Sequence, residues 1–418
     1  MNITLQTIHE DDYEQFIERH PLGNFVQSVP NAYRNRDSGW HAHFVGARNK
    51  EGKLIATALL YEWKTMGWGE FECLQGPLLD YGDTVLMMDF LVALRHYVKE
   101  HRGFLLRVQP PLILRRGDDA AKLIDDTSHL SVVTEIGKAG FKSIPVSQTD
   151  NNARYLRWMF AKDLSDFAND AELVASFDTK TRSSIRFAHK QGIRVKEITD
   201  KTELSPLVDL MLETGKRRHF SARNAQYYEE LFSYYSRKQA RFVIATLDVD
   251  VYRQKIEEQS RHIEEQYTAI GDDPARMGER KELDNQRNAI KKRRETYNEL
   301  KELNLQGVIP LAAAIFMTVG PEFVYFLSGS DDRYASFNAP YAIQEWALKT
   351  ALSEGFHRYN FYGTNGNFND VPAQEGVYRF KKGFGGQLEE WSGCFDYVAR
   401  PAIFVAVSVI RWVRSIIH

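Results

Sequence analysis

The sequence predicts a mixed α/β protein in which two related units follow each other and the second is interrupted by an antiparallel helical hairpin. Its 418 residues leave room for two or three units, at roughly 100–200 residues each. Strand-like and helix-like stretches alternate in both halves, the order typical of sheets backed by helices. A polar segment in the second half carries a seven-residue apolar repeat, which indicates a pair of packed helices.

The first half begins with helical spacing at 11–20, followed by strand-like runs at 41–63 on either side of the turn at 48–53. A third strand ends at Gly76-Pro77, an amphipathic helix covers 84–101, and an apolar strand is stopped by Pro110-Pro111. From Leu156 onward the second half has a similar alternation of strands and helices, with a helix at 173–192 that ends at Gly192. We expect the first unit over 1–150, the second over 151–250 and 308–395, the hairpin over 251–307 and a C-terminal amphipathic helix over 396–418.

The hairpin prediction rests on apolar residues seven apart. Ile256, Ile263 and Ile270 precede the turn "GDDPARMG", and Leu283 and Ile290 follow it. Between Val251 and Leu305 the chain has 12 basic and 12 acidic residues, so the outer faces of both helices must be solvated. A solvated spacer or dimerisation arm fits this pattern. An RNA-contacting arm also fits, because the pattern includes a run of four cations: Lys291, Lys292, Arg293 and Arg294.

Composition excludes several classes of protein. With 54 Lys and Arg against 56 Asp and Glu, the net charge of -2 excludes binding of nucleic acid through overall basicity, though not through local patches. Two cysteines, Cys73 and Cys394, cannot build a disulfide scaffold or a four-thiolate metal site. The N-terminus lacks a signal-peptide pattern and no run of ~18 apolar residues occurs, so we expect a cytoplasmic protein. No metal-ligand spacing or cofactor motif stands out, and we expect neither group.

The residues that could carry chemistry are mainly cations beside aromatic side chains. There is no P-loop, HExxH or GxSxG motif, and "GTNGNFND" at 363–370 is only a weak phosphate-loop candidate. Arg182, Arg186 and Lys190 are spaced to lie on one helix face. Further clusters surround Arg223 and Lys381, near Tyr227 and Phe380. Each cluster alone fits a solvated surface; together they favour a polyanionic ligand, such as a diphosphate or a tRNA end.

Several stretches, taken in order, resemble the Fem (FemABX) family of peptidoglycan interpeptide-bridge aminoacyltransferases. The resemblance covers essentially the whole chain, with the hairpin in the expected place. The matching stretches are "FVQS" from Phe25, "LLRVQP" from Leu105, "TRSSIRFAHKQGIRV" from Thr181, "FSARNAQYYEELF" from Phe220, "NFYGTNG" from Asn360 and "GVYRFKKGFGG" from Gly376.

The resemblance implies two tandem domains like those of GCN5-related N-acyltransferases (GNATs). It implies transfer of an amino acid from aminoacyl-tRNA to the amine of the third stem-peptide residue, or of the growing bridge, in a peptidoglycan precursor. Lipid II and UDP-MurNAc-pentapeptide are the two forms of that acceptor. An acyl-CoA-dependent N-acyltransferase of the same superfamily and a non-catalytic tRNA-binding protein are the alternatives.

The resemblance also implies site residues. Lys381, preceded by Phe380, matches a lysine near the reacting ester, and Arg223 matches an arginine that holds the precursor's phosphates. Tyr325 lies where a family strand lines the peptide channel, and we add Lys382 as substrate-binding. The helix of Arg182, Arg186 and Lys190 matches a basic helix of the relatives. We assign these three residues to tRNA binding, together with Lys291, Lys292, Arg293 and Arg294.

Two positions in the first unit depart from the family pattern. Where relatives carry Trp and a phosphate-binding Lys after the "QS" pair, this sequence has Asn31 and Asn35. Arg34 or Arg36, on either side of Asn35, could supply the missing charge, or both could be merely exposed.

The C-terminal stretch "FVAVSVIRWVRSII" is strongly apolar, and its only charges are Arg411 and Arg414. As an interfacial helix it could rest on the inner membrane leaflet beside a lipid-linked precursor. Docking of the same helix against the first unit is the structural alternative.

Overall fold

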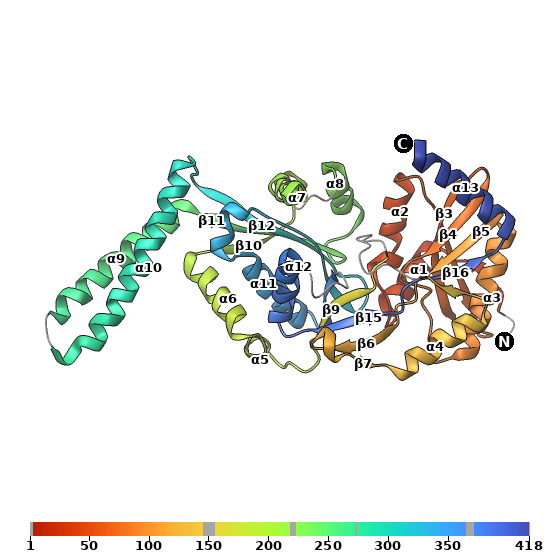
Figure 1. The fold of residues 1–418 in the computed structure, drawn as a ribbon, viewed down its shortest axis with the longest axis horizontal. Helices are drawn as coiled ribbons and strands as arrows, with labels where there is room; N and C mark the ends of the chain where they lie inside the picture. The colour runs from red at the N-terminus through yellow and green to blue at the C-terminus, as the bar shows by residue number, and fades with distance from the viewer. Residues whose placement is uncertain (1–2, 145–154, 218–222, 272–273, 365–371, 418) are drawn as a thin grey trace.

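The computed structural model describes residues 3–144, 155–217, 223–271, 274–364 and 372–417. Two α/β units adjoin to form an elongated body, and the helical hairpin projects from the end formed by the second unit (Figure 1). Each unit is built on one twisted sheet covered by helices.

The first sheet has the strand order β1-β2-β3-β4-β5-β16-β8. Helix α3 packs along it and buries Phe90 and Leu94 against Phe71 and Leu106, which is the amphipathic face predicted for 84–101. The strands are β1 (Gln6–Thr7), β2 (His41–Arg48), β3 (Leu54–Thr65), β4 (Trp68–Cys73), β5 (Gly103–Val108), β16 (Phe395–Val398) and β8 (Lys142–Ser143), and the helices are α1 (Glu10–Arg19), α2 (Val29–Asp37), α3 (Thr84–Glu100) and α4 (Thr127–Lys138).

The second sheet has the order β10-β11-β12-β13-β14-β9-β15-β6-β7. Its strands are β10 (Arg194–Ile198), β11 (Ala240–Asp248), β12 (Val308–Met317), β13 (Glu322–Ser330), β14 (Arg358–Thr364), β9 (Trp158–Asp163), β15 (Gln387–Trp391), β6 (Ile113–Gly117) and β7 (Ile124–Asp125). The associated helices are α5 (Asp170–Ala175), α6 (Thr179–Gln191), α7 (Ser205–Arg217), α8 (Ala225–Tyr234), α11 (Ala339–Ser353) and α12 (Pro372–Gly383), and the chain ends with α13 (Pro401–Ile417).

The two sheets exchange strands. The hairpin of β6 and β7 comes from the first part of the chain but pairs with β15 in the second sheet. Strand β16, near the C-terminus, returns to the first sheet between β5 and β8. One apolar core also contains residues of both halves, for example Tyr13 and Phe25 with Met211 and Phe242. The body is therefore continuous, and the division of the chain at residue 150 stays a prediction.

Each sheet contains one parallel pair among otherwise antiparallel neighbours. In the second sheet, β13 and β14 pair only from Glu322–Arg358 to Val324–Asn360. Beyond Asn360, β14 continues against β9 alone, with a register shift before Gly363. Tyr362 lies in this irregular stretch and has a left-handed φ of 63°, which is uncommon for a residue with a side chain. The parting of β13 and β14 is where the candidate site forms.

The hairpin follows the predicted seven-residue pattern. Helices α9 (Val249–Ile270) and α10 (Met277–Glu302) pack against each other, and 22 residues of α9 correspond to about 33 Å at 1.5 Å per residue. The predicted seam is buried; it comprises Ile256, Ile263, Ile270, Leu283 and Ile290. The helical hairpin is therefore confirmed.

The helix predicted at 173–192 is instead two helices, α5 and α6. Phe177, between them, turns inward and packs edge-on against Phe384, with ring centroids 5.2 Å apart. Asp178 then accepts a hydrogen bond from the Thr181 N–H and caps α6. Gly192 ends α6 with a φ of 91°, which confirms the predicted C-cap.

Candidate active site

Lys381 is a buried lysine whose ammonium group faces the backbone of β14. It lies on α12, and its Nζ donates hydrogen bonds to the carbonyl oxygens of Tyr362 (3.2 Å) and Gly363 (2.7 Å). Burial lowers the pKa of Lys381 to about 7. The preceding residue, Phe380, packs on Tyr341 and Phe384 and keeps this part of α12 against the core.

Two arginines from different units meet at one tyrosine. The guanidinium carbon of Arg34, on α2, lies 5.2 Å from the centroid of the Tyr227 ring. The guanidinium carbon of Arg223, just before α8, lies 5.1 Å from the same centroid. Both distances are within the range of cation–π contacts. Tyr227 thus brings together two cations that are 189 positions apart in the sequence (34 and 223).

Local capping sets the positions of these cations. Ser28 caps α2, accepting from the Asn31 N–H, and Asn31 in turn accepts a hydrogen bond from Arg34 through its Oδ1 at 2.9 Å. Asn224 caps α8, accepting from the Tyr227 N–H at 3.0 Å. The Arg34 Nε is buried and has no hydrogen-bond partner among the residues that the structure describes.

Tyr362 contacts Lys381 and aromatic residues of both units. Its carbonyl accepts from Lys381, and its ring packs against Phe25 of the first unit (5.9 Å) and Phe326 of β13 (5.5 Å). The pKa of the Tyr362 phenol is raised above its usual value, mainly by burial and also by Tyr227, and the charge of Arg34 offsets only part of this rise. Tyr227 and Tyr362 both pack against the apolar core that contains residues of both halves. We call Lys381, Tyr362, Arg34, Tyr227 and Arg223 the junction cluster.

Three other predicted residues point away from the junction cluster. Arg36 forms an ion pair with Glu10 at 3.4 Å. Lys382 forms an ion pair at 2.8 Å with Asp119, which lies between β6 and β7. Tyr325 packs on Phe316, with centroids 5.6 Å apart, while its neighbour Phe326 faces Tyr362. Their predicted roles stay predictions.

The cations predicted to bind tRNA fall into two groups. Arg186 and Lys190 on α6 and Lys291, Lys292 and Arg294 on α10 are exposed. Two others are engaged within the chain: Arg182 donates to the Ala175 carbonyl at 2.7 Å, and Arg293 is buried at the base of the hairpin.

Arg293 joins the hairpin to α6. Its Nε donates to Gln191 Oε1 at 2.9 Å, a second nitrogen donates to Gln259, and the guanidinium carbon lies 5.2 Å from the Tyr252 ring centroid. Through these contacts Arg293 links α10 to α6, the two helices that carry the exposed cations.

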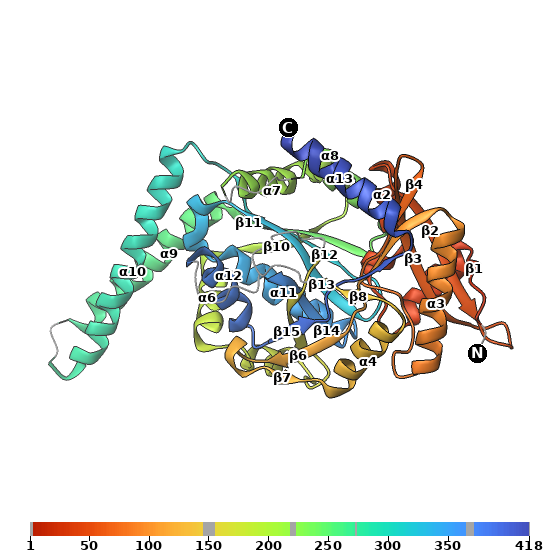
Figure 2. The same ribbon diagram turned by 45° about the vertical axis from the view of Figure 1, so that its right-hand side comes forward.

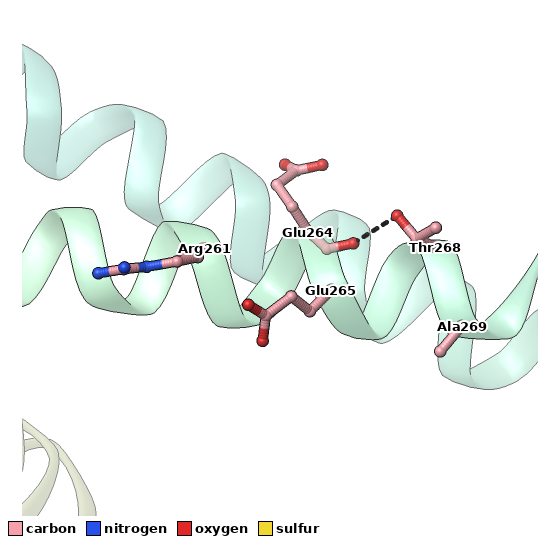
Figure 3. Close-up of a pocket in the computed structure, with 5 residues that line it drawn as sticks. All are labelled: Arg261, Glu264, Glu265, Thr268 and Ala269. Carbon is pink, nitrogen blue, oxygen red and sulfur yellow. Dashed lines mark hydrogen bonds between the residues drawn. The ribbon is translucent and has the colours of Figure 1, made fainter.

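The hairpin also carries a shallow hollow on α9, away from the junction cluster (Figure 3). Arg261, Glu264 and Glu265 extend from the helix there, and the Thr268 hydroxyl donates to the Glu264 carbonyl at 2.8 Å. These are ordinary solvated helix side chains. The described residues contain no group of three or more His, Cys, Asp or Glu side chains placed to hold a metal ion. The weak phosphate-loop candidate at 363–370 lies outside the described residues from 365 onward.

The comparisons with known proteins decide the family. The model of the FemAB family matches residues 8–411. The chain belongs to the FemAB family. It is 24% identical to the aminoacyltransferase FemA of Staphylococcus aureus (strain bovine RF122 / ET3-1) over 411 residues, covering 97% of each chain. It is 25% identical to FemA of Staphylococcus epidermidis over 392 residues, covering 92% of this chain and 93% of the relative.

A crystal structure of FemX has the same fold, with a TM-score of 0.77, 21% identity and coverage of 96% of this chain and 99% of that one. This FemAB-family protein is therefore a mixed α/β protein with the fold of FemX, and the helical hairpin lies where the sequence predicted it. The predicted enzyme class is confirmed: the protein is an aminoacyltransferase of peptidoglycan-bridge synthesis.

Sequence reasoning did not include Tyr362 among the site residues of this FemAB-family protein, and it noted Tyr227 only as an aromatic neighbour of the cations. The signal for Tyr227 was available, because Asn224 is a strong N-cap and places Tyr227 in the first turn beside Arg223. No local pattern marks Tyr362, whose position depends on the irregular pairing of β14 with β9.

Proposed function

We propose that this protein transfers an amino acid from aminoacyl-tRNA to an amine of a peptidoglycan precursor. The acceptor is the side-chain amine of the third stem-peptide residue or the end of the growing bridge, and lipid II is the favoured carrier. The reaction takes place on the cytoplasmic side of the membrane. The observation that supports this function best is the contact of Arg34 and Arg223, from the two units, with one tyrosine ring, while Lys381 binds the backbone of Tyr362.

The arginine pair suits a diphosphate. Arg34 comes from the first unit and Arg223 from the second, and both guanidinium groups contact the ring of Tyr227. Guanidinium groups match phosphate oxygens in geometry and charge, and such charge-assisted hydrogen bonds are stronger than neutral ones. The buried Arg34 Nε, which has no hydrogen-bond partner in the described part of the chain, is a donor for such an anion. Arg34 thereby takes the place of the lysine that the family pattern has at Asn35.

Lys381 suits the reacting ester. When the acceptor amine attacks the ester carbonyl, a C–N bond forms and negative charge develops on the carbonyl oxygen. The ester C–O bond then breaks, and the tRNA ribose oxygen leaves with a proton from the amine. A protonated Lys381 stabilises either oxygen, and its low surrounding dielectric strengthens that interaction. No covalent enzyme intermediate is required, since the ester is already activated.

The exposed cations of α6 and α10 are proposed to contact tRNA. Arg186 and Lys190 lie on α6, Lys291 and Lys292 lie on α10, and Arg293 fixes the two elements to each other. Contacts of this type are salt-sensitive and largely independent of sequence. Arg293 itself is buried, so its part is to support this surface.

The experiment uses purified protein, tRNA charged with a labelled amino acid, and two acceptors: the lipid-linked precursor and the nucleotide-linked precursor. We expect label in the stem peptide of the lipid-linked acceptor, located at the third residue or the bridge by mass spectrometry. Transfer only from an acyl-CoA donor, or no transfer with any mixture of common aminoacyl-tRNAs, would contradict the proposal.

A further inference from the structure

The C-terminal helix α13 is packed on one face only. Phe404 and Val407 lie in an apolar cluster with Phe104 and Leu105 of β5. Further along the helix, Arg411 forms an ion pair with Glu70 of β4 at 2.6 Å. This face docks α13 on the first sheet. Docking against the first unit was one of the two alternatives that the sequence left open.

The opposite face of α13 is apolar and open to solvent. Val405, Val409, Trp412 and Val413 are 59%, 52%, 65% and 41% exposed. Their spacing of four, three and one places them on one side of a helix. Large apolar side chains exposed together in this way mark a surface that meets another apolar phase.

We infer that this face of α13, the exposed α13 stripe, docks the protein on the surface of an anionic lipid membrane. The charges of the surrounding residues favour that partner. Helix α13 carries no acidic residue, and Arg414 lies beyond Arg411, whose charge is paired with Glu70. At its N-terminal end, Arg102 and Arg400 stack on the Trp68 ring, at 5.0 and 5.2 Å from its centroid.

The composition of the exposed α13 stripe also fits an interfacial helix. Such helices bury an apolar face at the boundary of headgroups and acyl chains, while arginines extend toward lipid phosphates. Tryptophan prefers this boundary because its ring is apolar and its N–H is polar. Among the described residues, no helix is long and apolar enough to cross a bilayer, so α13 lies on the surface in this proposal. A second copy of the chain is disfavoured, because stable protein interfaces use about 20–30 residues a side.

The location of α13 relates this membrane contact to the junction cluster. In both views α13 runs along the upper side of the body, where α2 and α8 also lie (Figures 1 and 2). These helices carry Arg34 and Tyr227 of the junction cluster. The inference rests on the proposed function in one respect: a lipid-linked acceptor gives the enzyme a reason to face the membrane.

The test measures co-sedimentation of the full chain with precursor-free vesicles of phosphatidylcholine containing phosphatidylglycerol, and with vesicles of phosphatidylcholine alone. We expect stronger binding to the anionic vesicles and at least about a tenfold weaker partition coefficient for Val409→Asp. Ile124→Asp is the matched control, since Ile124 is 73% exposed on β7, away from α13. Equal binding by Val409→Asp and wild type would overturn the inference.

Two further measurements separate the possible outcomes. Sedimentation velocity tests for a dimer that Val409→Asp abolishes; such a dimer would overturn the inference in favour of self-association. Transfer to vesicle-embedded precursor is expected to fall in Val409→Asp, whereas transfer to a soluble acceptor fragment is expected to be unchanged. Vesicle binding without any transfer by the wild type would contradict the proposed function and leave the membrane contact supported.

Discussion

Arg34 and Arg223 place their guanidinium carbons 5.2 and 5.1 Å from the centroid of the same Tyr227 ring. One arginine comes from α2 of the first unit and the other precedes α8 of the second. Under the proposed function, a diphosphate bound here contacts both units at once. Loss of either arginine should therefore weaken binding of the precursor more than it slows the chemical step.

The first prediction concerns these two arginines. Arg34→Ala and Arg223→Ala should each raise the KM for the precursor by about 10- to 100-fold, because a charge-assisted hydrogen bond is worth roughly 1.5–3 kcal/mol. The double variant should lose less than the sum of the two, since the arginines act on one ligand. Arg36→Ala is the control and should behave as wild type, because Arg36 pairs with Glu10. A changed KM in Arg36→Ala together with an unchanged one in Arg34→Ala would reverse the assignment.

The second prediction concerns Tyr227. Tyr227→Phe keeps the aromatic ring beneath both guanidinium groups and should retain a KM within about threefold of wild type. Tyr227→Leu removes the ring and should raise the precursor KM about tenfold. Steady-state kinetics at varied precursor concentration measure the difference. Equal loss in both variants would mean that the phenol, and not the ring, is the required group.

The third prediction follows from the burial of Lys381, which lowers its pKa to about 7. An unfolded lysine keeps its proton up to about pH 10.4, so between about pH 7 and 10 the unfolded state binds more protons at this site. The stability contribution of Lys381 therefore rises with pH over that window. The free energy of unfolding of wild type, minus that of Lys381→Met, should increase by about 2 kcal/mol between pH 7 and 9.

The neighbouring lysine provides the control for this pH dependence. The hydrogen bond to Asp119 raises the pKa of Lys382, so Lys382→Met should show a flat difference over the same range. Denaturant titrations at pH 7, 8 and 9 give both differences. A flat difference for Lys381→Met as well would mean that folded Lys381 keeps its proton at pH 9.

The fourth prediction concerns two basic residues of the hairpin, one that stabilises the fold and one that is proposed to bind tRNA. Arg293→Met should lower the free energy of unfolding by about 1–3 kcal/mol, because it leaves the buried amide of Gln191 and the half-buried amide of Gln259 without this partner. Lys292→Ala should leave stability within about 0.5 kcal/mol of wild type but weaken tRNA binding and reduce its salt dependence. Thermal melts and filter binding at two salt concentrations measure these effects. Unaltered tRNA binding when Lys291, Lys292 and Arg294 are all replaced would remove the hairpin from the proposed interface.

Much of the fold could be predicted from local patterns. The seven-residue spacing of Ile256, Ile263 and Ile270 identified the hairpin seam because coiled-coil packing repeats with that period. Gly192 marked the end of α6 because its left-handed conformation suits glycine. The break between α5 and α6 was missed, since the inward turn of Phe177 depends on its contact with the distant Phe384.

Long-range relationships could not be predicted in the same way. No local signal places β16 beside β5, or β6 beside β15, because strand pairing depends on the whole chain. Arg34 and Arg36 were equivalent candidates in sequence. Two residues apart on a helix, they point in different directions, and only the packing of α2 beside α8 selects Arg34.

In the proposed mechanism, Lys381 acts on the reacting ester while Arg34 and Arg223 hold the precursor. The decisive measurement is the turnover of Lys381→Met at saturating aminoacyl-tRNA and precursor, with thermal melting to show that the variant is folded. Loss of a positioned charge from a buried site commonly costs about 10²- to 10³-fold in rate, and we expect a kcat reduced by that factor with a precursor KM near that of wild type. A kcat within about twofold of wild type in the folded variant would contradict the claim.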